Sequence, residues 1–250
     1  MLKNLKAIVI VFILAVGMTA AQPYITVGTG YNFPAASEII YRPDKPHSNT
    51  SIEYENKYGS FGQGLDFKAA FGTMITQNFG LEIGVNYRSG KKLEYQDYLD
   101  QSAFIPVTYT SHYWGISPTA ILKVSEKSFS PYIKAGVILA IPKVTGEEGT
   151  TPPPYFPASW HKLEYSGRLA FGYTGAIGAE MTQGPLSYFG EINFAALSWK
   201  PAKLKSSYDN SSAEYTLKDD SASLGPNDAV VPTMFAFSAV GINLGVKYNF

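Results

Sequence analysis

Three histidines, His47, His112 and His161, are the side chains best suited to nucleophilic or acid–base chemistry. His112 directly follows Ser111, so a hydroxyl nucleophile and a general base are neighbours along the chain. Successive residues of an extended segment point to opposite faces, which would separate the two side chains. We therefore interpret His112 as an isolated histidine and predict no catalytic residue and no enzymatic activity.

Metal and cofactor sites also lack a recognisable pattern. The chain has no cysteine, and no histidines stand at the spacing of a zinc site. Asp209, Asp219 and Asp220 share one segment but lack the spacing of an EF-hand loop. No glycine motif for phosphates or dinucleotides joins a strand to a helix. We expect no metal and no cofactor, and the balance of 20 basic and 20 acidic residues argues against nucleic acid as a partner.

Charged residues that alternate with apolar ones form the second group of candidates. They would share the inner face of a narrow barrel, and they comprise Asp66, Lys68, Glu82, Arg88, Lys123, Lys134, Glu164, Arg168, Glu180, Glu191 and Lys247. Charges in so confined a space are costly unless they pair, so we expect ion pairs that fill the lumen. Mixed signs argue against a strongly ion-selective pore. A narrow or gated conducting path is the alternative interpretation.

The elements that position these residues are predicted by an apolar–polar alternation of period two. In the last segment Val240, Ile242 and Leu244 fall on one parity, and Gly241 and Asn243 fall on the other. Similar alternation predicts eight strands, near 23–34, 61–76, 80–90, 106–124, 131–142, 163–182, 187–200 and 232–250. Three connections between them are short, whereas the stretches 35–60, 91–105, 143–162 and 201–231 are long and polar.

This regular exchange of short and long connections is typical of outer-membrane barrels. The fold class we predict is all-β: a transmembrane, up-and-down antiparallel β-barrel of about eight strands. The soluble alternatives are a β-sandwich or a lipocalin-type barrel. The many glycines on the polar parity favour the membrane barrel, because small residues fit a crowded lumen.

The N-terminus carries the pattern of a cleaved signal peptide. Lys3 and Lys6 precede an apolar run over 7–16, and small residues stand at 19–21. The run is too short for a membrane-spanning helix, which needs about 20 apolar residues. We therefore expect a signal peptide over 1–21 and a single barrel domain over 22–250.

The C-terminal segment GINLGVKYNF resembles the last strand of bacterial outer-membrane proteins. In those proteins alternate apolar residues and a final aromatic residue resemble the signal read by the barrel-assembly machinery, and Tyr248 and Phe250 match its aromatic positions. Residues 22–250 resemble the small eight-stranded group that contains the OmpA transmembrane domain, OmpX and OmpW, and the outer membrane protein beta-barrel domain family. The sequence has no counterpart of the peptidoglycan-binding domain of OmpA, so no tether to the cell wall is expected.

Lipid-modifying enzymes of the PagL type have a related small barrel, with a histidine followed two residues later by a serine. Here Trp114 occupies that second position. The resemblance therefore does not extend to a catalytic pair.

The long connections are the remaining candidates for function. The stretch around Tyr155, Phe156 and Trp160 is rich in proline, which stiffens the backbone, and in aromatic rings, which offer a large contact area. It suggests an external contact surface, or else rings that pack back onto the barrel. The function we expect is structural, or binding of an unknown extracellular ligand or partner through the external loops, in contact with outer-membrane lipids. A transporter for small or hydrophobic solutes is second, and a lipid-modifying enzyme is third.

Overall fold

The structure is a computed structural model, and the regular elements among the residues it describes are all β-strands. These residues are 22–35, 38–41, 44–48, 51–54, 57–98, 104–124, 128–149, 160–208, 211–218, 228–230 and 234–250. The predicted signal peptide therefore lies outside the described residues. No helix in the described part of the chain is long and apolar enough to cross a bilayer.

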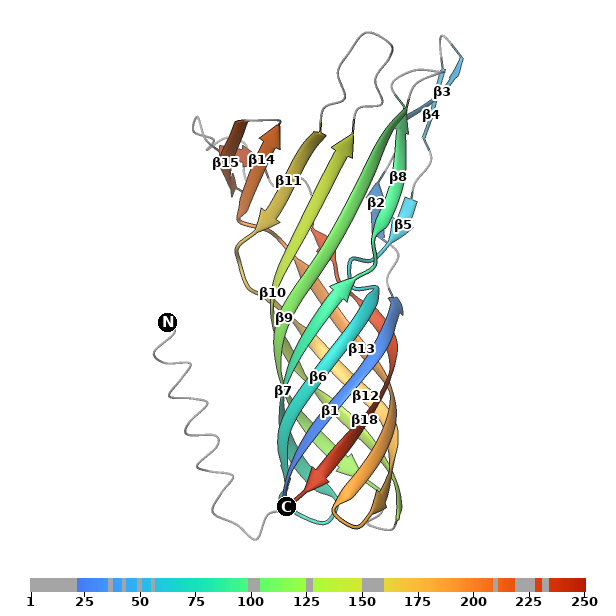
Figure 1. The fold of residues 1–250 in the computed structure, drawn as a ribbon, viewed down its shortest axis with the longest axis vertical. Helices are drawn as coiled ribbons and strands as arrows, with labels where there is room; N and C mark the ends of the chain where they lie inside the picture. Colours follow the sequence, from blue (N-terminus) through green and yellow to red (C-terminus); the bar gives the residue numbers. More distant parts are fainter. Residues whose placement is uncertain are drawn as a thin grey trace.

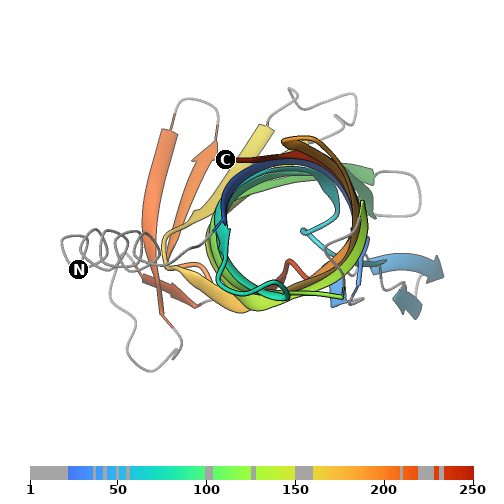
Figure 2. The same ribbon diagram turned by 90° about the horizontal axis from the view of Figure 1, so that it is seen from below.

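Eight strands form a closed barrel in which every neighbouring pair is antiparallel (Figures 1 and 2). They are β1 (Gln22–Pro34), β6 (Gly64–Met74), β7 (Phe79–Gly90), β9 (Phe104–Lys123), β10 (Phe129–Gly149), β12 (Ala170–Gln183), β13 (Leu186–Trp199) and β18 (Ala239–Asn249). The ladder between β1 and β18 closes the ring, with Tyr24 opposite Asn249 and Pro34 opposite Ala239. This arrangement confirms the predicted fold class.

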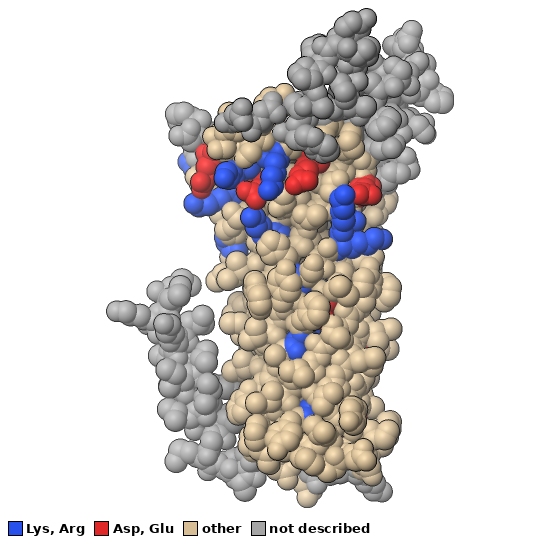
Figure 3. Space-filling model, in the orientation of Figure 1, with Lys and Arg blue, Asp and Glu red and all other residues tan. Residues whose placement is uncertain are grey.

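The outer face of the barrel is apolar and exposed, as the alternation in the sequence predicts. On β18, Val240, Ile242 and Leu244 are 41%, 56% and 64% exposed, whereas Gly241 and Asn243 between them are buried. Figure 3 shows the result on one side of the barrel, as an almost uncharged wall. A soluble monomer rarely exposes an apolar surface of this extent, so the wall is suited to a lipid environment.

The two ends of the barrel differ. At one end, here called the turn end, β6 connects to β7, β9 to β10 and β12 to β13 through short turns. At the opposite end, β9 and β10 continue beyond the barrel wall (Figure 1). This end is here called the sheet end.

The sheet of the barrel continues beyond the wall at the sheet end, on both sides of β9 and β10. β8 (Leu93–Tyr98) pairs with β9, and β11 (Trp160–Ser166) pairs with β10. The order then continues through β14 (Lys203–Tyr208), β15 (Ser211–Lys218) and β16 (Asp228–Val230). We call these five strands and the adjoining parts of β9 and β10 the extended sheet. Figures 1 and 2 both place β14 and β15 outside the ring of the barrel.

Four short strands lie between β1 and β6, in two pairs. β2 (Glu38–Tyr41) pairs with β5 (Lys57–Gly59), and β3 (Asp44–Ser48) pairs with β4 (Ser51–Tyr54). One further short strand, β17 (Phe235–Ala236), pairs with the end of β13. Stretches predicted as long polar loops therefore contain much regular β-structure.

The predicted strand 163–182 is wrong as a single element. Gly167 and Arg168 adopt positive φ angles of 80° and 56°, which bend the chain between β11 and β12. Trp199 Nε1 donates to the carbonyl oxygens of both bend residues at 3.1 Å. The chain consequently leaves the extended sheet at Ser166 and enters the barrel wall at Ala170. The predicted strand 232–250 is likewise divided, into β17 and β18.

Candidate functional site: the lumen and the extended sheet

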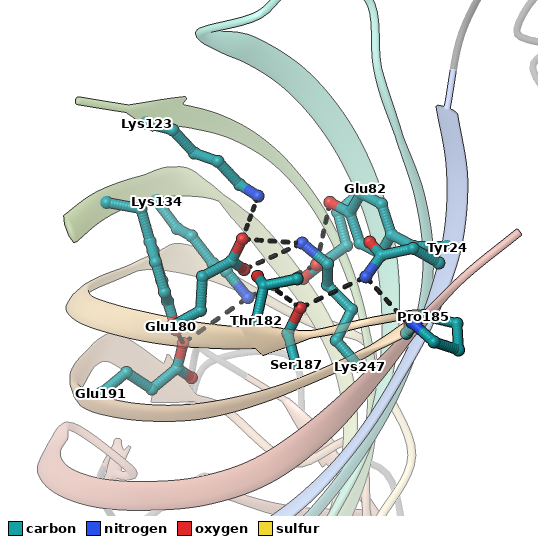
Figure 4. A network of polar contacts seen from close by, with 12 residues as sticks. Tyr24, Glu82, Lys123, Lys134, Glu180, Thr182, Pro185, Ser187, Glu191 and Lys247 are labelled. Carbon is teal, nitrogen blue, oxygen red and sulfur yellow. Dashed lines mark hydrogen bonds and ion pairs between the residues drawn. The ribbon is translucent and has the colours of Figure 1, made fainter. Parts of the chain in front are cut away.

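Two lysines share one glutamate near the turn end of the lumen. Glu180 on β12 forms ion pairs with Lys123 on β9 and with Lys247 on β18, the latter at 2.8 Å (Figure 4). The Lys247 ammonium also lies 4.6 Å from the centre of the Tyr24 ring. The three charged side chains come from three different strands, so their ion pairs connect separate parts of the barrel wall across the lumen.

A chain of charges of alternating sign continues from there toward the sheet end. Tyr24 connects the two groups, because its hydroxyl donates to Glu82 at 3.4 Å while its ring lies beside Lys247. Each successive pair in the chain lies between 3.2 and 3.6 Å apart, in the order Glu82, Lys134, Glu191, Lys68, Asp66 and Arg88.

All eight barrel strands contribute to this network. β1 supplies Tyr24, and the other seven strands supply the nine charges, which are four acids and five bases. Tyr132 and Asn243 add neutral hydrogen bonds to Glu191, at 3.1 and 3.3 Å. Pairing and hydrogen bonding of this kind offset the cost of burying charge in a narrow space. The network also ties every strand to the others across the lumen.

Space remains inside the barrel at its mid-height and at its turn end. A cavity of about 60 Å³ lies at mid-height, and its lining includes Asn86, Thr119 and Asn193. A vestibule of about 290 Å³ lies at the turn end beside Lys123 and Lys247. Between them the side chains of the network leave only about 10 Å³, less than or about equal to the space one water molecule occupies. The lumen is therefore closed at this level.

An aromatic cluster closes the lumen a second time, at the sheet end. Its buried residues include Phe61, Tyr113, Trp199, Phe235 and Phe237. The ring centres of Phe61 and Phe235 lie 5.2 Å apart, nearly perpendicular to each other, which is a favourable geometry for aromatic pairs. An ion-pair network and an apolar cluster thus close the lumen at successive levels.

The segment from Ser60 to Gln63 crosses the mouth of the barrel and brings Phe61 into the cluster. Phe61 N donates to Ala236 O at 2.8 Å, and Ser111 Oγ donates to Phe61 O at 2.8 Å. A Cβ atom on Gly62 would lie 2.0 Å from Phe237 O, so only glycine fits here. The segment is therefore anchored to both β9 and β17.

This aromatic cluster was not predicted from the sequence. Phe61 and Phe235 stand near the starts of the predicted strands 61–76 and 232–250, and neither residue was predicted to point into the lumen. The sequence does indicate that Trp199 and Phe237 point inward. Trp199 has the same parity as Glu191 along β13, and Phe237 has the same parity as Asn243 of the neighbouring strand β18. Tyr24 and Tyr132 were also missed as network residues, although both are aromatic residues on inward positions.

Two of the eleven residues predicted for the lumen lie elsewhere, and the prediction is corrected for them. Glu164 is on β11 of the extended sheet, where it accepts from Lys143 at 3.1 Å and lies 3.5 Å from Lys162. Arg168 is exposed at the bend between β11 and β12. Both were placed in the lumen because the period-two pattern continues through the bend. The other nine residues line the lumen as described above.

His112 and His161 do not assemble a complete hydrolytic site. His112 is exposed on the outer face beside Tyr87, whereas Ser111 points inward. His161 is nearer to a triad, since its Nε2 lies 2.8 Å from Ser206 Oγ and its Nδ1 lies 3.6 Å from Glu148 Oε2.

A triad also needs backbone or side-chain donors that stabilise the oxyanion. The N–H groups of β14 around Ser206 belong to a strand that is paired on both sides. Within the described residues, no group of three acidic or histidine side chains could hold a metal ion.

The remaining predicted contact residues are only partly described. Tyr155 and Phe156 lie outside the described residues, and Trp160 begins β11, where its backbone is opposite Gly149. Tyr248 and Phe250 lie exposed on the outer face with ring centres 5.2 Å apart.

Comparison with solved structures supports the assignment of the fold. A major outer membrane protein from Thermus thermophilus is similar over 92% of this chain and 100% of its own, with a TM-score of 0.54 and 12% identity. The chain has the fold of an outer-membrane β-barrel.

Two other outer-membrane proteins align more weakly. Ail of Yersinia pestis, solved with the heparin analogue sucrose octasulfate, aligns over 92% of this chain and 97% of its own, with 9% identity and a TM-score of 0.31. The protease OmpT of Escherichia coli aligns over 92% and 96%, with 9% identity and a TM-score of 0.32. No protein-family model and no curated protein matches the sequence.

Proposed function

We propose that this chain is a non-enzymatic protein of the bacterial outer membrane, whose closed barrel anchors the extended sheet at the cell surface. The observation that carries this proposal is the contrast between the two ends. The lumen is closed twice, by the ion-pair network and by the aromatic cluster, while β9 and β10 extend beyond the wall to support five further strands. A structure of this kind is better suited to presenting a surface than to conducting solutes.

The orientation follows from the general architecture of such barrels, whose short turns face the periplasm and whose long connections face outward. The turn end would thus be periplasmic, with both chain termini of the barrel, and the extended sheet would be extracellular. The apolar wall would contact outer-membrane lipids. Any ligand or partner would bind to the extended sheet or to the connections beside it, including the segment with Tyr155, Phe156 and Trp160.

Epitope accessibility tests this orientation. An epitope tag inserted between Asp209 and Asn210, in the connection between β14 and β15, should be labelled by antibody on intact cells. The matched control is the same tag at Gly184, in the β12–β13 turn, which should be labelled only after the cells are lysed. Equal labelling of both tags on intact cells, or of neither, would contradict the proposal.

We also propose that Tyr248 and Phe250 form the signal for the barrel-assembly machinery. Both rings are exposed on the outer face at the end of β18, where another protein can contact them. Replacing Phe250 with Ala should lower the amount of folded protein in the membrane, whereas Val240→Ala, on the same face of the strand, should not.

A narrow conducting path is the second candidate. The vestibule at the turn end and the cavity at mid-height favour it, because only the side chains around Tyr24 and Lys134 separate them. Such a path would require these side chains and the aromatic cluster to move together.

A further inference from the structure

The outward face of the extended sheet continues the lipid-facing face of the barrel. On β10, Ile141 is 61% exposed on the outer face, and Lys143 follows two residues later on the same side. The distance covered by two residues of a strand is only about 7 Å. The outer surface therefore changes from apolar to cationic within two residues of the strand.

Three rows of side chains cross this face, and their charges differ with distance from the barrel. The row nearest the wall contains Lys203, beside Ser166 and Thr216, and Lys143 lies at the same end of β10. The second row aligns Thr145, Glu164, Lys205 and Glu214. The third row aligns Glu147, Lys162, Ser207 and Ser212.

Cations are thus concentrated next to the apolar wall. Besides Lys143 and Lys203, this level contains two further cations. They are Arg168, at the exposed bend, and Lys200, directly after β13. Among the described residues of this lowest level there is no acid, and the acids begin in the second row. In Figure 3 the lowest charged side chains on the surface, directly above the uncharged wall, are basic, and basic and acidic side chains lie together above them.

The connection from β7 to β8 shows the same order. Lys91 and Lys92 stand at the turn from β7 to β8, and Glu94 follows them farther along β8. Lys92 Nζ pairs with Glu94 Oε1 at 2.7 Å, and both side chains are largely exposed.

The ion pairs of these lysines do not neutralise the surface. Lys143 and Lys162 share Glu164, and Lys203 pairs with Glu214 at 2.9 Å. Pairs at an exposed surface are weak, so a lysine can exchange one anionic partner for another at little cost. Long lysine side chains can also reach down toward a membrane surface while their stems remain on apolar residues.

We propose that Lys143, Lys203, Arg168 and Lys200 form a binding surface for the phosphate groups of lipids in the outer leaflet. Phosphate has the charge and the acceptor oxygens that these cations require, and the apolar wall directly below them would hold the acyl chains of the same lipid. The extended sheet overhangs the barrel, so its lower edge lies over the lipids that surround the wall. This inference rests on the proposed placement of the apolar wall in the outer membrane.

The test compares two pairs of lysines on the same face. Lys143→Gln with Lys203→Gln removes two charges from the lowest row, and Lys162→Gln with Lys205→Gln removes two charges from the rows above it. The pairs are matched, because each contains one partner of Glu164 and one lysine close to Glu214. The full chain is folded in detergent micelles, and diphosphoryl lipid A and a dephosphorylated form with the same acyl chains are titrated. Bound lipids are counted by native mass spectrometry, and a heat-shifted band on a gel verifies that each variant is folded.

The wild-type chain should prefer the diphosphoryl lipid, and this preference should weaken as salt is added. The Lys143/Lys203 variant should bind the diphosphoryl lipid roughly thirtyfold more weakly at low salt, since each basic residue near a membrane surface contributes about one factor of five. The Lys162/Lys205 variant should lose less than about threefold.

Equal losses in both variants, or equal binding of the two lipids by the wild-type chain, would overturn the proposal. The comparison of the two lipids uses the wild-type chain alone, so it tests the proposal even if a variant does not fold. Because the assay uses micelles, its result is independent of the epitope labelling that tests the proposed orientation, so the two proposals can fail separately.

Discussion

Asp66 on β6 lies directly opposite Arg88 on β7 in the barrel ladder, and Arg88 Nε donates to Asp66 Oδ1 at 3.3 Å. Both side chains are almost completely buried, at 0% and 2% exposure. Arg88 also donates to Gly62 O at 3.4 Å and lies against the Tyr113 ring. This one pair therefore connects the ion-pair network to the aromatic cluster.

Removing one partner of this pair should destabilise the barrel strongly. Arg88→Met leaves the buried Asp66 carboxylate with Lys68, at 3.4 Å, as its remaining cationic partner, and removing one partner of a buried ion pair costs about 3–5 kcal/mol. The free energy of unfolding in urea, measured in micelles, gives the effect. The control is Lys92→Gln, which breaks the exposed pair with Glu94 and should cost less than about 1 kcal/mol. Similar losses in the two variants would show that the buried network does not hold the barrel together.

The aromatic cluster should contribute separately to stability. Phe237→Ala removes a fully buried ring and should cost about 3–5 kcal/mol. It should also loosen the segment from Ser60 to Gln63, which a protease would then cut faster. Met234→Ala, at an exposed position nearby, serves as the control and should change neither property. Unchanged protease resistance in the Phe237 variant would contradict the packing of Phe61 against Phe237, whose ring centres lie 6.0 Å apart.

Glu164 in the extended sheet should titrate at an unusually low pH. The hydrogen bond from Lys143 lowers the pKa of Glu164, and the charges of Lys143 and Lys162 add to the effect against the opposing influence of burial. A lowered pKa means that Glu164 stabilises the fold above the pKa of the unfolded chain, and that this contribution is lost as the pH falls through the folded pKa.

Replacing Lys143 with Gln should therefore raise the pKa of Glu164 toward the ordinary value. Carbon-13 NMR of the Glu164 carboxyl group measures this directly. Glu94 is the internal reference, because its pKa is lowered by Lys92 and should not move. A constant pKa for Glu164 would show that the Lys143 contact does not form in solution.

Ser206 should not react with a fluorophosphonate probe, although His161 Nε2 is within hydrogen-bond distance. Its strand neighbours use their N–H groups in the sheet, so an attacked carbonyl would find no oxyanion donors from β14. Labelling that disappears in Ser206→Ala and in His161→Ala would reveal an enzyme and overturn the non-enzymatic proposal.

The barrel was predictable because its signal is local. Each strand must turn an apolar side chain to the outside at every second residue, and Val240 to Leu244 show this in the sequence itself. The inward parity likewise located nine charges of the lumen. Their pairing order was not predictable, because it depends on the register between strands and on how far each side chain reaches.

The extended sheet could not be derived in the same way. Its outward face carries Lys203, Lys205 and Glu214, and such polar strands resemble loops in composition. The break at Gly167 and Arg168 was hidden for the opposite reason, since the alternation continues through it. Tertiary pairing of β11 with β14, and not the local pattern, decides where the barrel wall begins.

The closed lumen is the central claim, and single-channel recording in planar lipid bilayers tests it most directly. The full chain should insert without conductance steps, whereas a variant altered at both closed levels, such as Glu180→Ala with Phe61→Ala and Phe237→Ala, should conduct. A heat-shifted band verifies that both proteins are folded. Discrete, reproducible steps from the unaltered chain would contradict the closed lumen and make the narrow channel the better account.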